Sequence, residues 1–354
     1  MNSPRANRAE GWPTGFMLIQ GNRLETLCGL MVAWMKRHPL HPLENETILV
    51  QSNGIAQWLY LALAANPGDA LEGGCGIAAA IRTSLPGRFI WYAYRCVLGN
   101  LPDSSAFDKA PMTWRLYRLL DDVEALAARL PNPECLAPLR GFLQEDDDPR
   151  RRHQLAAQLA DLYDQYQVYR ADWLEHWQAG KDILIRPDGS QEPVPEIQRW
   201  QPTLWRILTQ DVAGETAGNP ECLDGGASRA AIHRRFMARI RALGTGPHAL
   251  DERLPRRVIV FGISSLPRQS LEVLEAISSR TQVMLFAHNP SRHYWGDIVE
   301  GRELFKRDYR RQRARKVPEN IDETRLHLHG HPLLAAWGKQ GRDYIRLLDE
   351  HDER

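Results

Sequence analysis

Three amide side chains and a hydroxyl follow an apolar run early in the chain. Gln51, Ser52 and Asn53 come directly after TILV, and Gln57 lies one helical turn later. In open α/β sheets, ligands bind outside the carboxyl ends of the strands, so a ligand site is expected here. The segment contains one glycine and no Lys, whereas a Walker-type phosphate loop needs several glycines and a Lys. Because Asn and Gln can pair with a base edge through two hydrogen bonds, the segment favours contact with nucleic-acid bases.

A second polar group lies in ADLYDQYQVYRADW, residues 160–173, a segment typical of a helix. Asp161 and Asp164 are three residues apart and share a helix face. A metal site would need a His or a further acid at ligand spacing, and the segment offers neither. A polar stripe that pairs with Arg170 accounts for the two acids without a ligand. In a cleft, the acids could instead accept from cytosine and Arg170 could reach guanine.

Two further segments combine residue types that bind nucleic acid. HNPSRHYWGDI, residues 288–298, places aromatic rings beside Arg after a strand, which suits base stacking but equally suits a structural loop. KRDYRRQRARK, residues 306–316, has seven basic residues in eleven and favours a flexible contact with DNA phosphates or a partner. His288 and His293 lie near Asp297 without a nucleophile, so a hydrolytic triad is not favoured.

The elements that must position these residues alternate between strands and helices. Strands are predicted over 16–20, 47–51, 258–262 and 281–290, and helices follow them over 21–38, 54–65 and 269–279. Residues 67–88 are predicted to form a loop, followed by a helix that runs to about Leu98. The chain is helical over 111–178, with interruptions at 131–134 and 145–153, and again over 195–213 and 227–243. Successive strand–helix units predict a parallel sheet with helices on its faces.

These elements predict an α/β protein with a helical insertion. We expect a disordered polar leader over residues 1–15, two parts of one α/β domain over 16–104 and 250–354, and an all-helical insertion over 105–249. The layout is that of the first motor domain, 1A with a 1B insertion, of superfamily 1 helicases. The last helix, GRDYIRLLDEHDER, runs to the final residue, which favours a truncated chain.

Both positions that a nucleotide-hydrolysing motor requires are altered. After the first strand, GNRLET replaces the P-loop pattern and contains no Lys. After the strand VIVFG, residues 263–265 are Ile, Ser and Ser, where a magnesium-organising acid should stand. The sequence therefore predicts a helicase fold whose nucleotide site is lost, with no ATPase or nuclease site and no cofactor of its own.

Composition limits the remaining classes of function. The 354 residues carry a net charge of +1, so any contact with DNA must be local. No apolar run reaches about 18 residues, which argues against a membrane span. The five cysteines form no Cys-x-x-Cys pair, as expected for reduced thiols in the cytoplasm.

Several strings together resemble the N-terminal part of the RecC family, the gamma chain of exodeoxyribonuclease V. They occur in the family's order over about residues 16 to 350: ILVQSNGIAQWL, LPGRFIW, DLYDQYQVYRADWL, VFGISSLP, NPSRHYWGDI and HPLLAAWGKQGRDYI. The resemblance implies an inactive helicase fold within a heterotrimer with the RecB helicase-nuclease and the RecD helicase. ATP and magnesium would then be used by those partners, which act on double-stranded DNA ends.

The resemblance also implies a channel that scans the unwound 3′ single strand for the Chi octamer during recombinational repair. Matched by motif, the scanning residues are Gln51, Asn53, Gln57, Leu85, Trp91, Asp161, Leu162, Asp164, Arg170 and, by a looser match, Arg229. The family pattern has Thr where this chain has Asn53. Two alternatives stay open, a purely structural scaffold for the partner subunits and an active superfamily 1 helicase.

Overall fold

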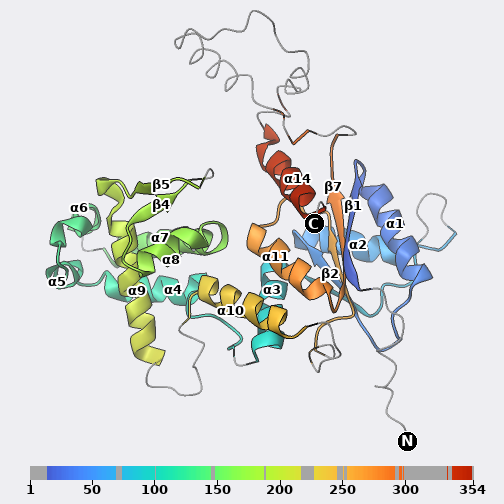
Figure 1. Ribbon diagram of the computed structural model, residues 1–354, viewed down its shortest axis with the longest axis horizontal. Coiled ribbons are helices and arrows are strands. Elements are labelled where there is room, and N and C mark those ends of the chain that lie inside the picture. Colours follow the sequence, from blue (N-terminus) through green and yellow to red (C-terminus); the bar gives the residue numbers. More distant parts are fainter. Residues whose placement is uncertain are drawn as a thin grey trace, which may run out of the picture. The chain divides into compact units, whose positions relative to one another are not determined.

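The computed structural model describes residues 14–68, 74–99, 101–144, 148–186, 189–216, 227–244, 250, 253–291, 295–296, 298, 333 and 337–352. It divides into two compact units (Figure 1). The sheet unit comprises Met1–Trp91 and Thr245–Arg354, and the helical unit comprises Tyr92–Gly244. Within the described residues, no helix is both long and apolar enough to span a membrane.

A five-stranded parallel sheet forms the centre of the sheet unit. Its order is β1-β7-β6-β2-β3, and every neighbouring pair is parallel. The strands are β1 (Gly15–Gly21), β2 (Glu46–Val50), β3 (Ile81–Ser84), β6 (Arg257–Phe261) and β7 (Gln282–His288). The apolar runs of β2, β6 and β7 are buried along nearly their whole length, as parallel strands covered on both faces require. The predicted α/β fold with a parallel sheet is confirmed.

Helices cover both faces of this sheet. The chain steps across the sheet in one direction from β1 to β3 and back from β6 to β7, so right-handed crossovers place the connecting helices on opposite faces. α1 (Leu24–Arg37) and α2 (Asn53–Ala64) share one buried core with the sheet, in which Met31 and Leu59 pack with Phe261. α11 (Arg268–Ser278) packs against β1 and β7. α3 (Pro86–Leu98) follows β3, and α14 (Lys339–Asp352) is the last described helix.

The strand β3 corrects the prediction of a loop over residues 67–88. Its sequence, IRTS, contains one apolar residue, so no hydrophobic pattern announces it. It forms at the edge of the sheet by pairing with β2 alone. The hydroxyl of Tyr60 on α2 donates to the carbonyl of Ile81 over 3.1 Å and fixes the start of the strand.

A buried arginine joins three segments at the amino end of the sheet. The Arg257 side chain is fully buried at the first residue of β6. Its Nη1 donates to Glu46 Oε1 over 2.7 Å, its Nε to Gln282 Oε1 over 2.8 Å and its Nη2 to the His38 carbonyl over 2.6 Å. Burial raises the pKa of Glu46 and lowers that of Arg257, while their mutual attraction opposes both shifts. This cluster links α1, β2, β6 and β7 at one point.

The helical unit is built mainly from helices around a tryptophan-rich core. The helices are α4 (Lys109–Leu119), α5 (Val123–Ala128), α6 (Ala137–Gln144), α7 (Pro149–Tyr169), α8 (Ala171–Gln178), α9 (Trp200–Thr216) and α10 (Arg229–Ala242), with short 3₁₀ turns at Pro133–Leu136 and Glu196–Gln198. Trp177 and Trp205 are fully buried beside Tyr163 in this core. The interruption predicted over 145–153 ends early, because Asp148 caps α7 by accepting from the Arg150 amide over 2.9 Å.

The prediction of an all-helical insertion is wrong in one place. β4 (Ile183–Ile185) and β5 (Gln191–Pro193) pair as an antiparallel hairpin. Gly189 has φ +81° in the turn, a conformation that glycine adopts without strain. The indole of Trp177 donates to the Ile183 carbonyl over 3.0 Å, so tertiary contact with α8 stabilises two strands of three residues each.

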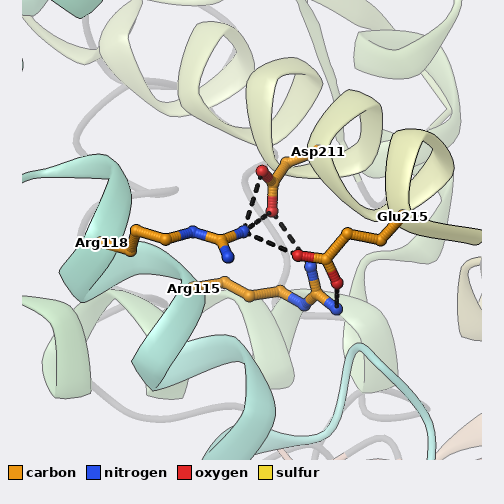
Figure 2. Close-up of polar contacts among 4 residues, drawn as sticks. All are labelled: Arg115, Arg118, Asp211 and Glu215. Carbon is orange, nitrogen blue, oxygen red and sulfur yellow. Dashed lines mark hydrogen bonds and ion pairs between the residues drawn. The ribbon is translucent and has the colours of Figure 1, made fainter.

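Ion pairs connect α4 to α9 on the surface of the helical unit. Figure 2 shows Arg115 and Arg118 of α4 facing Asp211 and Glu215 of α9. Arg115 binds Asp211 over 3.0 Å and Glu215 over 2.5 Å, and Arg118 binds the same acids over 2.8 and 2.9 Å. The two arginines hold the pKa of Glu215 below its usual range. The positive charges of this part of α4 are thereby neutralised within the unit.

Candidate nucleic-acid interface

The carboxyl ends of the five strands lie along one edge of the sheet. Gln51 follows β2 there, and its Oε1 accepts from Ser264 in the loop after β6, over 3.2 Å from Oγ and 3.4 Å from the backbone amide. β2 and β6 are neighbours in the sheet, which explains why these two loops meet. The Gln51 side chain is exposed, and its Nε2 donates to no residue within the described ranges.

The start of α2 presents two further amides. Ser52 caps the helix by accepting from the Ile55 amide over 3.4 Å. Asn53 and Gln57 are exposed and four residues apart, so they lie on one face of the first turns. Neither side chain forms a hydrogen bond to any residue that the structure describes. Their donors and acceptors are therefore available to a ligand.

Leu85 and Trp91 follow the neighbouring strand, β3. Leu85 lies between β3 and α3, and its side chain is 47% exposed. Because β3 pairs with β2, Leu85 stands at the same edge of the sheet as Gln51. Trp91 lies on α3 and is half-buried. The edge thus combines amides with an exposed apolar side chain.

The same edge contains polar residues that were not among the predicted scanning residues. Asn289, directly after β7, donates from Nδ2 to Gln20 Oε1 over 2.8 Å and accepts at Oδ1 from the Trp295 indole over 2.8 Å. Gln340 of α14 donates to Ser265 Oγ over 2.8 Å. The position of Asn289 after an apolar strand was the available signal. Residues 292–294 and 297, and the whole basic run 306–316, lie outside the described residues.

In the helical unit, the acids of α7 are paired with cations from other helices. The Nζ of Lys109 donates to Asp161 Oδ1 over 2.6 Å, and this bond lowers the pKa of Asp161. Gln165 also donates to Asp161, over 3.1 Å. Leu162, the next residue, is half-buried. Asp161 is therefore an exposed carboxylate in a fixed position.

Arg229 joins three helices at one end of this group. Its Nη1 lies 3.2 Å from Asp164 Oδ1 and its Nη2 lies 2.6 Å from Asp108 Oδ1. Ser228 caps α10 and so positions Arg229 on its first turn. Burial raises the pKa of Asp164, and the attraction of Arg229 opposes this shift. Arg229 and Asp164, matched separately from sequence, are thus brought into contact.

The sequence predicts that Arg170 pairs with the acids of α7, and the structure gives it other partners. Arg170 ends α7, where the backbone leaves the helix, and its guanidinium turns toward α8. It binds both carboxylate oxygens of Asp172, over 3.1 and 2.9 Å, and the Ile185 carbonyl, and it stacks 4.0 Å from the Trp173 ring centroid. The acids Asp161 and Asp164 do pair with cations, but these cations are Lys109 and Arg229. Among the described residues, no three His, Cys, Asp or Glu side chains form a group suited to a metal ion.

The fold and this edge define a class of protein. A doubly wound parallel sheet with polar side chains at its carboxyl edge is an α/β domain, a fold in which ligands generally bind at that edge. Residues 16–354 match the family described as RecC, N-terminal domain. The chain belongs to this family.

Curated relatives agree with the family assignment. The chain is 38% identical over 347 residues to the RecBCD enzyme subunit RecC of Escherichia coli K12, covering 94% of this chain and 28% of that protein. It is 32% identical to the subunit of the same name from Haemophilus influenzae, covering 96% and 31%. For the Mycolicibacterium smegmatis subunit the identity is 24%, covering 95% and 25%. The chain spans less than a third of the length of these relatives.

Proposed function

We propose that this chain acts within a RecC subunit of a RecBCD-type complex, together with RecB and RecD, in recombinational repair of double-strand breaks. In this proposal it binds the unwound 3′ single strand and scans it for the Chi sequence. It hydrolyses neither nucleotide nor DNA itself, and ATP and magnesium are used by the partner subunits. Membership in the RecC N-terminal domain family supports this placement.

The observation that carries the proposal is the set of available amides at the carboxyl edge of the sheet. Asn53 and Gln57 project from the first turns of α2 without a partner among the described residues. Gln51 stands beside them with its Oε1 held by Ser264. An amide whose orientation is fixed by the protein can distinguish a base edge that donates from one that accepts.

The turn after β1 supports the absence of hydrolysis. A phosphate loop needs space above its glycines and a Lys, and residues 21–26 contain no Lys. A Cβ placed on Gly21 would lie 2.9 Å from Leu27 Cδ2, so the apolar side chain of α1 closes over this turn. After β6, Ser264 lies among the residues where a motor would have its magnesium-organising acid, and its hydroxyl donates to Gln51 instead.

The test is to replace Gln57 by Ala in the assembled complex and to measure the nuclease response to Chi alongside the unwinding rate. Loss of one good base contact should reduce discrimination by about 1–3 kcal/mol, with unwinding unchanged. Gln198→Ala, at an exposed glutamine of the helical unit, is the matched control. An unchanged response in the Gln57 and Asn53 variants would refute base reading by α2. ATPase activity of the purified chain that depended on residues 21–26 would refute the inactive motor.

The geometry of Arg170 favours a second candidate role for part of the predicted set. The Nε and Nη2 of its guanidinium donate to Asp172 and the Ile185 carbonyl, and the guanidinium stacks on the Trp173 ring. A side chain used in this way stabilises the junction of α7 and α8 and is not free to read a base. A scaffold role therefore fits Arg170, and substituting it should lower the stability of the helical unit before it changes Chi discrimination.

A further inference from the structure

The most exposed tryptophan of the helical unit lies on the surface formed by α4 and α7. The side chain of Trp114 is 62% exposed. Its ring centroid lies 5.9 Å from that of Tyr117, at an interplanar angle of 81°, and 5.4 Å from that of His153. Edge-to-face packing of this kind holds the indole in place while leaving much of it open to solvent. Within the described residues, this indole is therefore held at the surface with most of its area exposed.

Tyr117 is in turn held in position by a neighbouring arginine. The Arg152 guanidinium lies 4.4 Å from the Tyr117 ring centroid, donates to its hydroxyl over 2.9 Å, and is paired with Asp121. The pair formed by Trp114 and Tyr117 therefore packs on Arg152, whose charge is neutralised by Asp121. This arrangement gives a rigid platform and not a mobile side chain.

The cations around Trp114 differ in what they can offer a ligand. Arg115 and Arg118 are neutralised by Asp211 and Glu215 (Figure 2). Arg150 is exposed, lies three residues before His153 on the same face of α7, and forms no ion pair with a residue of the described ranges. An available guanidinium one helical turn from His153, the ring that packs against the exposed Trp114 indole, is suited to a phosphate beside a stacked base.

The platform also continues the predicted site. α4 and α7 run antiparallel, because Lys109 binds Asp161 at one end while Trp114 and Tyr117 meet His153 and Arg152 at the other. His153 precedes Asp161 by eight residues, about 12 Å along the helix. One face of the helical unit therefore leads from the predicted scanning residues to the aromatic platform.

We propose that Trp114 is a stacking site for a base of the single strand, with Arg150 as its phosphate contact, beyond the scanning residues of α7. This inference rests on the proposed function, because it requires the strand to pass over the α7 acids. Stacking accepts any base, since every base has a flat face. The site would hold the strand during scanning without reading its sequence.

The experiment uses the assembled complex and single-stranded DNA carrying 5-iodouracil, which crosslinks to aromatic side chains that lie against it. The expected crosslink maps to the peptide that contains Trp114. Trp114→Ala should abolish that crosslink and weaken binding of oligo-dT about tenfold, and Trp114→Phe should retain most of both. Arg150→Ala should weaken oligo-dT binding at low salt more than at high salt. Trp337→Ala, at an exposed tryptophan of the sheet unit, is the matched control and should change nothing.

The other outcomes separate the two levels of the proposal. Crosslinks confined to residues 51–57 or 161–170, with normal affinity in Trp114→Ala, would overturn the stacking site and leave the proposed function standing. No crosslink anywhere on this chain would overturn both. Loss of a partner subunit from the purified Trp114→Ala complex, with DNA affinity of the remaining chain intact, would assign the platform to protein docking and overturn the inference.

Discussion

Replacing Arg257 by Met should destabilise the sheet unit far more than any surface substitution. The change removes the hydrogen bonds of Arg257 to Glu46, Gln282 and His38 and leaves Glu46, itself only 8% exposed, without this cation. Breaking a buried ion pair by removing one partner costs about 3–5 kcal/mol. Arg256→Met is the matched control. Its side chain is 22% exposed and its guanidinium lies 3.3 Å from Glu44, so the expected cost is below about 1 kcal/mol.

Hydrogen exchange of peptides from β2 and β6 measures this cost within the sheet unit. A loss of about 3 kcal/mol corresponds to roughly hundredfold faster exchange. Burial already raises the pKa of Glu46, so lowering the pH toward that raised value should protonate it in the folded state and reduce the cost. Adding Glu46→Leu to Arg257→Met should restore much of the protection. If Arg257→Met exchanged no faster than Arg256→Met at pH 7, the cluster would not hold the sheet as argued.

Three further predictions concern substitutions of single residues. The pKa of Asp164 is raised from 3.8 by burial, so its contribution to stability is complete below that value and is lost as pH rises through the folded pKa. Thermal melts at pH 4 and 7 should therefore show that Asp164→Asn loses stability relative to the wild type toward acid, and a constant difference would contradict this. Arg115→Ala should cost about 1 kcal/mol at low salt and much less in 1 M NaCl, measured by urea unfolding, since its ion pairs with α9 are only partly buried. Gly262→Ala should cost about 1 kcal/mol because φ is +63°, whereas Gly54→Ala, in helical backbone, should be neutral or stabilising, and equal midpoints for the two would be inconsistent.

The sequence predicted the elements whose hydrophobic patterns are strong. The apolar runs of β1, β2, β6 and β7 and the helical spacing of α1 and α2 placed these elements within a few residues of their observed bounds. β3 and the β4–β5 hairpin were missed because strands of three or four residues carry little pattern of their own. They form by pairing with β2 and by contact with α8, which depend on the tertiary structure.

The candidate site was predictable to the extent that single residues follow strands. Gln51, Asn53 and Gln57 could be selected because they come directly after β2. The contact between Gln51 and Ser264 could not be predicted, because it depends on β6 lying beside β2 in the sheet. These strands are far apart in the sequence, since Glu46 of β2 and Arg257 of β6 are separated by 211 positions. The pairing of Asp161 with Lys109 was missed for the same reason, because Lys109 comes from a helix 52 residues earlier.

The order of the strands has a consequence for the synthesis of the protein. β1 has a single neighbour, β7, and both β6 and β7 lie between β1 and β2, so the first 91 residues cannot assemble a continuous sheet. At 5–20 residues per second, the ribosome needs roughly 10–40 s to add the next 200 or so residues through His288. The helical unit is one uninterrupted stretch and can fold during that interval. β1 meanwhile has no partner and β2 pairs with β3 alone, so this segment is the one that chaperones should bind as the chain emerges.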